Sequence, residues 1–363
     1  MKHMVVIAGL LLAALSLGST AAPQTEPPHV VLVTLDGVRT EEMFGGLDLE
    51  ALTSTLGKDQ AAADAPVYRK FWASSAEERR RKVMPFFWTL MAEHGSIAGN
   101  RALGSFVGVR NTHWFSYPGY AEILLGEARD AEIKSNDPIR NPFPTVLEGI
   151  RDGLSLAPGA VATFASWPIF TYIVEHEEGR TFVNAGVRTL GATEPETQVV
   201  DRMQHEVRTP WPGTRFDAFT FRLAMSYLAS ARPRVLYIAF DETDDWAHDG
   251  RYDLVLESLA QTDAFLRELW TWLQNDEEYR GRTHLLITTD HGRGHTAKDW
   301  RRHGADVPGS NETWIAMVSP TMKERGERRG GSELSTSQIA STIALWMGID
   351  WNANHPAAGG PIQ

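Results

Sequence analysis

The sequence contains no cysteine among its 363 residues. Disulfides and zinc sites with thiolate ligands are therefore excluded, and any transition metal has to be held by imidazole and carboxylate groups. Positive charge is also scarce, because 35 basic residues face 46 acidic ones and the formal net charge is −11. Nucleic acid is not expected as a structural partner, since binding to its backbone depends on clustered positive charge. A site for an anionic substrate would need local positive charge or a metal.

Several common catalytic and nucleotide-binding motifs are missing as well. The chain has no GxxxxGK[ST] loop, no glycine fingerprint of a dinucleotide-binding domain and no GxSxG turn around any serine. These absences argue against a nucleotide-binding fold of either kind and against the common serine-hydrolase arrangement.

The beginning of the chain has the pattern of a secretory signal. The basic Lys2 precedes an apolar run at residues 5–17, and small residues follow at 19–22. The apolar run is too short for a comfortable transmembrane span. We therefore predict a signal peptide at residues 1–22 and an exported protein, periplasmic or secreted, with no stable membrane anchor. An uncleaved anchor is the alternative.

Three short apolar segments each run directly into an aspartate, at Asp36, Asp241 and Asp290. Continuous runs of Val, Ile and Leu are typical of parallel strands that helices cover on both faces. In open α/β sheets, ligands bind beyond the carboxyl ends of such strands. The repeated pattern predicts a metal-binding or catalytic site at one rim of a sheet.

The alternation of apolar strands with helices predicts an α/β fold with a central, mainly parallel sheet and helices on both faces. Residues 23–363 are expected to form a single domain, in which residues 151–230 carry few motifs and are a candidate substrate-facing insertion. The expected strands are residues 29–35, 160–165, 234–240, 284–289 and 313–318, and the expected helices are residues 84–94, 143–150, 215–231, 253–273 and 336–347.

Histidines lie close to two of the three aspartates. His291 follows Asp290 directly, in the glycine-rich segment TTDHGRG. Asp244 and His248 are four residues apart, which places them on the same face of a helical turn. A carboxylate and an imidazole arranged in this way can ligate one Zn²⁺.

Two ligand choices stay open on the residues alone. Asp241 and Asp245 compete with Asp244 as the carboxylate ligand in the run DETDDWAH. His303 and His295 are both candidates for a further imidazole. We favour His303, because it lies in a loop of small residues before a predicted strand.

Ser116, in FSYPGY, precedes an apolar helical stretch. At the start of a helix, backbone N–H groups and the helix dipole favour an anion, so Ser116 is a candidate nucleophile. The alternative is a purely structural N-cap, because Ser before Tyr-Pro is a good capping pattern.

Taken together, these segments resemble the alkaline phosphatase superfamily, and most closely its type I phosphodiesterase/nucleotide pyrophosphatase branch. The resemblance implies an alkaline-phosphatase-like α/β fold and covers most of residues 29–50, 105–150 and 235–348. The segments that carry it, by their order and spacing, are LVTLDGVR, FSYPGYAEILLG, DETDDWAHDG, TTDHGRG and HGADVPG.

The resemblance implies two Zn²⁺ ions, although Mn²⁺ or another divalent metal would accept similar ligands. It also makes Ser116 the nucleophile, and Asn136 is similar to the asparagine that holds a non-bridging phosphoryl oxygen. Thr243 departs from the pattern, since the diesterase branch usually has proline there. The implied ligands are Asp36, Ser116, Asp290 and His291 for one ion, and Asp244, His248 and His303 for the other.

The activity implied by the resemblance is that of an exported two-metal hydrolase of phosphoric esters, a phosphatase or a phosphodiesterase, acting on a small phosphorylated substrate through a phosphoserine. The alternatives are a phosphotransferase or phosphomutase of the same superfamily and a catalytically inactive exported metal-binding protein. A sulfatase is not favoured, because Tyr120 stands where the C/S-x-P-x-R frame requires arginine. No coiled-coil pattern or apolar stripe predicts an oligomeric state.

Overall fold

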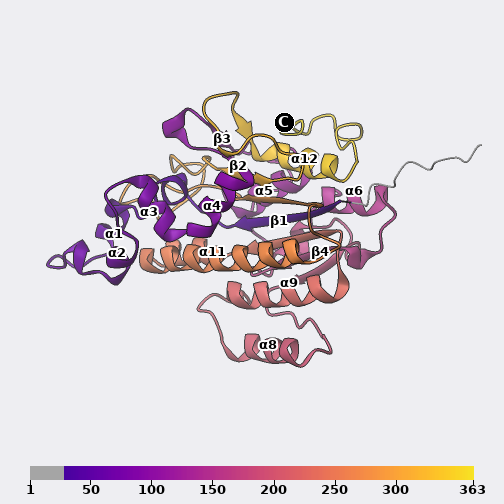
Figure 1. Cartoon of the computed structure of the whole chain (residues 1–363), viewed down its shortest axis with the longest axis horizontal. Helices are drawn as coiled ribbons and strands as arrows, with labels where there is room; N and C mark the ends of the chain where they lie inside the picture. Colours follow the sequence, from indigo (N-terminus) through magenta and orange to yellow (C-terminus); the bar gives the residue numbers. More distant parts are fainter. Residues whose placement is uncertain (1–27) are drawn as a thin grey trace, which may run out of the picture.

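The computed structural model describes residues 28–363, and an eight-stranded sheet lies at its centre (Figure 1). The strand order is β5-β4-β6-β1-β7-β8-β2-β9. The strands from β5 to β7 are parallel, whereas β8 is antiparallel to β7 and to β2. The predicted mainly parallel sheet is therefore confirmed. The strands are β1 (His29–Leu35), β2 (Gly95–Ala98), β4 (Val161–Ala165), β5 (Phe182–Ala185), β6 (Val235–Phe240), β7 (Thr283–Thr288), β8 (Ile315–Val318) and β9 (Gly326–Glu327), with β3 (Val107–Gly108) and β10 (Leu334–Ser335) forming a separate pair.

Helices cover both faces of the sheet, as expected. The side chains of β1 alternate between the two faces, so that Val31 and Val33 belong to one buried apolar cluster and Val30 and Leu32 to the other. Helices α9 and α11 pack on the first face, and α5, α6 and α12 on the second (Figure 1). The helices are α1 (Leu49–Ser54), α2 (Pro66–Phe71), α3 (Ala76–Val83), α4 (Pro85–Glu93), α5 (Ser116–Leu125), α6 (Val146–Gly153), α7 (Phe170–Ile173), α8 (Pro195–Glu206), α9 (Asp217–Ala231), α10 (Glu242–His248), α11 (Tyr252–Asn275) and α12 (Ile339–Trp346), with short helical turns η1 (Glu41–Gly45), η2 (Ala62–Asp64), η3 (Arg101–Leu103), η4 (Pro158–Ala160) and η5 (Thr336–Gln338).

The central strands bring the three predicted aspartates to one rim of the sheet. Leu35 at the end of β1 lies beside Phe240 at the end of β6, and β7 runs parallel to β1 on its other side. Asp36, Asp241 and Asp290 follow these strand ends within two residues. Parallel strands place their carboxyl ends together, so the rim is the location expected for a ligand site.

The stretch at residues 151–230 is an insertion only in part. It contributes β4 and β5 to the sheet and α9 to one of its faces. The part between β5 and α9, which includes α8, lies outside the sheet (Figure 1). Trp211 in this part reaches the C-terminal end of α10, because its Nε1 donates a hydrogen bond of 3.1 Å to Asp249, the residue after that helix. The substrate-facing role expected for residues 151–230 stays a prediction.

The predicted signal peptide at residues 1–22 lies outside the described residues. Between residues 28 and 363, no helix is both long enough and apolar enough to cross a bilayer. The two apolar clusters lie on either side of one sheet, and their members are spread along the chain between Val30 and Ile362. A single domain over residues 23–363 therefore stays our interpretation.

Candidate active site

The first group of predicted ligands lies where β1 and β7 end. Asp36 follows β1, and Asp290 and His291 follow β7. Nε2 of His291 is 3.4 Å from Oδ1 of Asp36 and 3.4 Å from Oδ2 of Asp290. All three side chains are buried, and their ligand atoms are close enough together to hold a metal ion. We refer to Asp36, Asp290 and His291 as the strand-end group.

Hydrogen bonds turn the carboxylates of the strand-end group toward a common point. Oδ2 of Asp36 accepts a hydrogen bond of 2.8 Å from the hydroxyl of Tyr120, and Oδ1 of Asp290 accepts one of 3.1 Å from the backbone N–H of Gly37. The opposite oxygens, Oδ1 of Asp36 and Oδ2 of Asp290, are buried without a hydrogen-bond partner. Buried polar atoms are rarely left unpaired, so two such oxygens beside an imidazole suit a cation.

A backbone contact also orients His291 toward the carboxylates of the strand-end group. Its Nδ1 lies 2.8 Å from the backbone oxygen of Gly292, a contact that leaves Nε2 to face the carboxylates. Burial alone would lower the pKa of His291, but the charge of Asp290 and the contact with Asp36 raise it to about 9. Burial, and then the charge of Asp36, raise the pKa of Asp290 to about 8. The concentrated negative charge thus favours a bound cation, whether a proton or a metal.

The second group of predicted ligands comes from α10 and from the loop after β7. Nε2 of His248 is 3.1 Å from Oδ2 of Asp244 and 2.9 Å from Nε2 of His303. Nε2 of His303 is 3.8 Å from Oδ1 of Asp244. Asp244 and His303 also form a candidate metal group with His291, so the two groups adjoin. We refer to Asp244, His248 and His303 as the helix-and-loop group.

The helix-and-loop group is more open to solvent than the strand-end group. The side chain of His248 is 47% exposed, whereas that of His291 is completely buried. Burial, and then the positive charge of His291, lower the pKa of both His248 and His303. Both imidazoles are therefore neutral near pH 7, which is the form that ligates metals.

The competing aspartates lie one turn apart at the start of α10 and face each other. Burial, and then the charge of Asp245, raise the pKa of Asp241 far above its usual range. Burial also raises the pKa of Asp245 to about 7. Of the three aspartates in this run, Asp244 is the one grouped with two histidines, so the geometry favours it as the ligand.

The competing histidine lies in a different environment. Nδ1 of His295 is 2.5 Å from a carboxylate oxygen of Glu41, and Nε2 is 3.3 Å from one of Glu312. The hydrogen bonds to Glu312 and Glu41 raise the pKa of His295 to about 10. His303, and not His295, therefore joins the predicted ligands.

Arg293 is a buried guanidinium that was not among the predicted site residues. It donates to the carboxylate of Asp244 and, at 3.0 Å, to the backbone oxygen of the same residue. Nη1 donates to the backbone oxygen of Arg301 at 2.8 Å. A Cβ on Gly37, whose φ is +60°, would collide with Asp244 and Arg293, so this close packing requires glycine. Burial lowers the pKa of Arg293 to about 9. Arg293 thus ties α10 to the loop that carries His303.

Ser116 is the first residue of α5, and its side chain faces the strand-end group. Its Oγ is 3.4 Å from Nε2 of His291. The N-cap position belongs to Phe115, and no side chain caps this helix, so the purely structural N-cap interpretation is wrong. Gly119, one turn further on, allows the close approach of α5, because a Cβ there would collide with the backbone of Asp290.

Two polar side chains hold the chain around Ser116. Oδ1 of Asn136 accepts a hydrogen bond of 3.0 Å from the backbone N–H of Tyr117, next to the candidate nucleophile. Glu122, which is buried on α5, accepts hydrogen bonds of 2.8 Å from the backbone N–H groups of Arg110 and Asn111. These contacts fix the loop that leads into Ser116.

The hydroxyls of Tyr120 and Thr243 also support the site, and both residues could have been singled out from the sequence. Tyr120 lies four residues after Ser116, which places both on one face of α5, and it is the donor to Asp36. Thr243 occupies the position where proline was expected. Its hydroxyl donates a hydrogen bond of 2.6 Å to the backbone oxygen of Asp36. The departure from the family pattern therefore joins α10 to the end of β1.

The donors at this rim fit divalent cations. They are carboxylate oxygens and imidazole nitrogens, which Zn²⁺ and Mn²⁺ both accept. Burial, and to a smaller extent the charge of Asp36, raise the pKa of both Asp241 and Asp245. Carboxylates in such number favour additional positive charge at the rim.

The match to a known protein family is consistent with a functional site at this rim of the sheet. The sequence model of a family described as type I phosphodiesterase / nucleotide pyrophosphatase matches residues 132–328, more than half of the chain. Among curated proteins, none matches the chain at a significant level. The match contains the whole helix-and-loop group, and Asp36 and Ser116 precede it.

Solved structures share the fold at low sequence identity. A protein in the alkaline phosphatase superfamily from Vibrio parahaemolyticus has a TM-score of 0.54 and 11% identity, covering 94% of this chain and 71% of its own. The phosphonate monoester hydrolase SpPMH from Silicibacter pomeroyi has a TM-score of 0.52 and 12% identity, with coverages of 92% and 76%. Ps i-CgsB in complex with k-i-k-neocarrahexaose has a TM-score of 0.54 and 13% identity, with coverages of 93% and 75%. The predicted alkaline-phosphatase-like fold is confirmed. The matched family supports a hydrolase of phosphoric esters.

Proposed function

Because the chain belongs to the type I phosphodiesterase / nucleotide pyrophosphatase family, we propose that it is an exported, metal-dependent hydrolase of phosphoric esters that works through a phosphoserine at Ser116. One observation carries the proposal. Ser116 Oγ and the unpaired oxygens of Asp36 and Asp290 all face Nε2 of His291. A serine hydroxyl at the start of a helix, beside a group suited to a cation, is well placed to attack phosphorus.

The strand-end and helix-and-loop groups would each hold one divalent ion, for which Zn²⁺ is our first choice. Such ions lower the pKa of a neighbouring hydroxyl and offset the negative charge of attacking and leaving oxygens. Ser116 would form a bond from Oγ to phosphorus while the ester oxygen leaves with a proton. Water would then break that bond, which releases phosphate or a monoester and restores the hydroxyl. His291 and Asp36 hold the geometry for both steps.

Three residues outside the metal groups have roles in this proposal. Asn136 keeps its amide N–H group for a non-bridging phosphoryl oxygen, because its Oδ1 is occupied by the backbone of Tyr117. Beside α10, Trp211 packs edge to face against Trp246 with ring centroids 4.5 Å apart. These rings offer an apolar wall to the leaving group of a small substrate.

The proposal is tested with p-nitrophenyl phosphate and bis(p-nitrophenyl) phosphate. Replacing Ser116 by alanine is expected to reduce hydrolysis of both by about 10³-fold or more, as losses of a catalytic nucleophile do. The matched control is Ser341→Ala in α12, which also removes the hydroxyl of a buried helical serine without a hydrogen-bond partner and is expected to keep full activity. Retained turnover in Ser116→Ala would contradict the proposal.

The same pair of substrates separates a monoesterase from a diesterase. A higher kcat/KM for the bis ester than for the monoester would indicate a diesterase, which is the activity that the family match favours. Phosphoryl transfer to an added alcohol in place of water would mark the phosphotransferase alternative. Stoichiometric metal binding without turnover of either ester would mark the inactive binding protein.

A further inference from the structure

Helices α9 and α10 begin next to each other, and both begin without a cap from their own N-cap residue. The first backbone N–H groups of a helix have no partner within it, so they need an acceptor from elsewhere when they are buried. The N-cap residues are Phe216 for α9 and Asp241 for α10, and neither side chain accepts a hydrogen bond from its own helix. The acceptors at both helix starts therefore come from other parts of the chain.

Two buried carboxylates supply these acceptors, and each caps the helix of the other. Asp217, the first residue of α9, accepts hydrogen bonds from the backbone N–H groups of Asp241 at 2.9 Å and Glu242 at 3.2 Å. Glu242, the first residue of α10, accepts one of 2.8 Å from the backbone N–H of Asp217. Carboxylates are favourable at helix N-termini because of the partial positive charge there. We refer to Asp217 and Glu242 as the reciprocal cap.

Side chains from two directions hold the reciprocal cap in place. The hydroxyl of Ser166, directly after β4, donates a hydrogen bond of 2.6 Å to Asp217. On the other side, Glu242 accepts hydrogen bonds of 3.3 Å from Nε1 of Trp246 and 3.2 Å from the hydroxyl of Ser258 on α11. Buried carboxylates are tolerated when they are hydrogen-bonded in this way. The cap therefore connects the start of α10 to both the sheet and α11.

The segment that leads into Asp217 also reaches the other end of α10. Nε1 of Trp211 donates a hydrogen bond of 3.1 Å to Asp249, the residue after α10. The ring of Trp211 packs against that of Trp246 with centroids 4.5 Å apart. One short stretch of chain, residues 211–217, therefore contacts α10 at both of its ends.

Arg215 anchors this stretch from within the fold. It is buried, and its Nη1 donates hydrogen bonds of 2.6 Å to Asn184 of β5 and 3.3 Å to Gln204 of α8. Its Nε donates one of 2.8 Å to Thr220 of α9. A guanidinium has its donors in a fixed plane, so it links these elements in one geometry. The position of Asp217, two residues further on, is thereby set by the edge strand β5 and by α9.

Helix α10 depends on such contacts for its position. It has seven residues, and isolated helices of fewer than about 12 residues are marginal in water. Asp244 and His248 lie on it, and ligands hold a metal tightly only when they are kept within about 0.5 Å of the required geometry. A group that fixes the start of α10 therefore bears directly on whether these two side chains meet His303.

We propose that Asp217 is a positioning residue for the ion of the helix-and-loop group. Through the reciprocal cap it holds the start of α10, so that Asp244 and His248 face His303. This role rests on the proposed function, because it concerns one of the two ions of that site. It requires no contact between Asp217 and the metal or the substrate.

The probe is Zn²⁺ alone, titrated into the full metal-free protein in competition with a chromophoric chelator. Two binding constants are expected in the wild type, and the one that His248→Ala lowers belongs to the helix-and-loop group. Asp217→Ala is expected to lower that constant by about tenfold, at the low end of the effect of groups that orient metal ligands, and to leave the other within about twofold. Asp217→Asn is expected to lower it by about threefold to fivefold, because one oxygen remains to accept a hydrogen bond.

The matched control is Asp263→Ala. Asp263 is a buried aspartate on α11 that caps a helix without metal ligands, since it accepts hydrogen bonds from the backbone N–H groups of Phe86 at 3.1 Å and Phe87 at 2.7 Å at the start of α4. Its loss is expected to lower the urea midpoint as much as Asp217→Ala does. Both Zn²⁺ constants are expected to stay within about twofold of the wild type.

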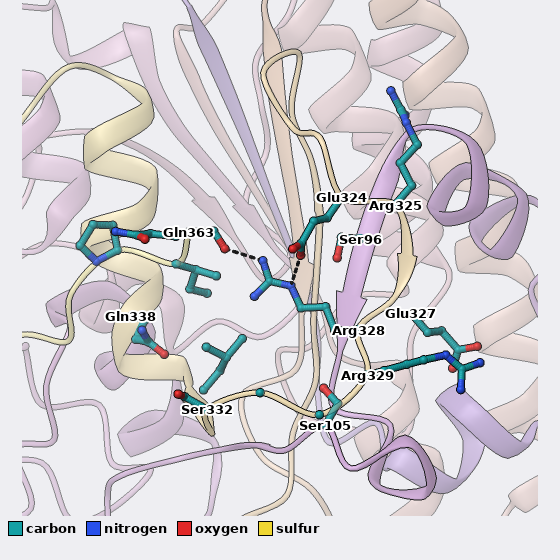
Figure 2. A pocket seen from close by; sticks show the side chains of 15 residues that line it. Ser96, Ser105, Glu324, Arg325, Glu327, Arg328, Arg329, Ser332, Gln338 and Gln363 are labelled. Carbon is teal, nitrogen blue, oxygen red and sulfur yellow. Dashed lines mark hydrogen bonds and ion pairs between the residues drawn. The ribbon is translucent and has the colours of Figure 1, made fainter.

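A second control removes a charged contact at the other end of the sheet. In the cavity of about 720 Å³ beside β2 and β9, Arg328 donates a hydrogen bond of 2.6 Å to the backbone oxygen of Gln363 and lies 3.5 Å from Glu324 (Figure 2). None of the proposed metal ligands lines this cavity. Arg328→Gln is therefore expected to change neither Zn²⁺ constant by more than about twofold.

Hydrogen exchange of the metal-free protein tests the same role without metal. The backbone N–H groups of residues 241–248 are expected to exchange faster in Asp217→Ala than in the wild type, and at the wild-type rate in Asp263→Ala. Wild-type Zn²⁺ constants or wild-type exchange in Asp217→Ala would overturn the proposal. Equal losses of Zn²⁺ affinity in Asp217→Ala and Asp263→Ala would also overturn it, because they would indicate a general loss of stability. If the wild type bound no Zn²⁺, the proposed function would fail, whereas the exchange measurement would still decide whether Asp217 holds α10.

Discussion

The two groups of candidate metal ligands are held in different ways. The strand-end group comes from the ends of two adjacent parallel strands and is completely buried. The helix-and-loop group comes from the one-turn spacing of α10 and from a loop residue, and His248 in it is half-exposed. Strand ends in a sheet have little freedom to move apart, whereas a short helix and a loop depend on side-chain ties such as Arg293. In the proposed two-ion site, the sheet would therefore hold the ion beside Ser116 rigidly, and the ion on the solvent side would have a more adjustable set of ligands.

Removal of one ligand from each group should expose this difference most strongly. His291→Ala is expected to lower kcat/KM by about 10³-fold or more even with excess Zn²⁺, because a buried ligand next to the nucleophile has no replacement. His248→Ala is expected to lower it by about 10- to 100-fold, with partial recovery in excess Zn²⁺, since water can take the place of an exposed ligand. Hydrolysis of bis(p-nitrophenyl) phosphate over a range of Zn²⁺ concentrations measures both. Equal losses with equal recovery would contradict the distinction between the groups.

Arg293 should matter for the folding of the helix-and-loop group. Arg293→Met leaves Asp244 buried without its cationic partner, and we expect the metal-free protein to lose about 3–5 kcal/mol in its free energy of unfolding. Added Zn²⁺ should recover much of this loss, because a divalent ion replaces the missing charge at Asp244. Urea unfolding with chelator and with Zn²⁺ tests the prediction. The same loss under both conditions would show that Asp244 does not bind the metal.

Tyr120 should affect the Zn²⁺ affinity of the strand-end group, although it is not one of the ligands. Tyr120→Phe removes the hydrogen bond to Oδ2 of Asp36, and a loss of about 10- to 100-fold in Zn²⁺ affinity is expected, as for other partners of metal ligands. The matched control is Tyr117→Phe on the same helix, whose hydroxyl bonds the backbone oxygens of Ile139 and Tyr172 instead. Competition with a chromophoric chelator measures the affinity. A similar loss in both variants would indicate damage to α5 and not to the ligand.

His295 should have the smallest effect, on stability and not on metal binding. Its pKa in the folded protein is raised to about 10 by Glu312 and Glu41, above the ordinary value of 6.5. The protonated contact therefore stabilises the fold fully below about pH 6.5, and this contribution disappears as the pH rises through 10. His295→Gln is expected to cost less than about 1 kcal/mol at pH 6, because the pair is partly exposed, and less still at pH 10. A cost that grows with pH, or a loss of bound Zn²⁺, would contradict this assignment.

The sequence predicted the strand-end group well because apolar runs show both the strand and its last residue. The strand expected at residues 29–35 matches β1, and the one expected at 284–289 differs from β7 by one residue at each end. The register of parallel strands then placed Asp36 and Asp290 together without further knowledge.

The helix-and-loop group could be predicted only in part. The four-residue spacing identified Asp244 and His248, but the choice among three aspartates depended on how α10 packs. The contact of Arg293 with Asp244 joins a loop residue to a residue of α10 that lies 49 positions earlier, and no local pattern encodes it. The strand β5 and helix α8 were not expected either, because residues 170–212 carry weak periodicity.

The central claim is that Ser116 carries the phosphoryl group during turnover. It is tested most directly by mixing the zinc-loaded protein with bis(p-nitrophenyl) phosphate, quenching in acid within the first turnover and measuring the mass of the peptide that contains Ser116. We predict an added phosphoryl group or its p-nitrophenyl ester on that serine in the wild type, and none in Ser116→Ala. Full turnover with an unmodified Ser116 peptide at every quench time would contradict the account.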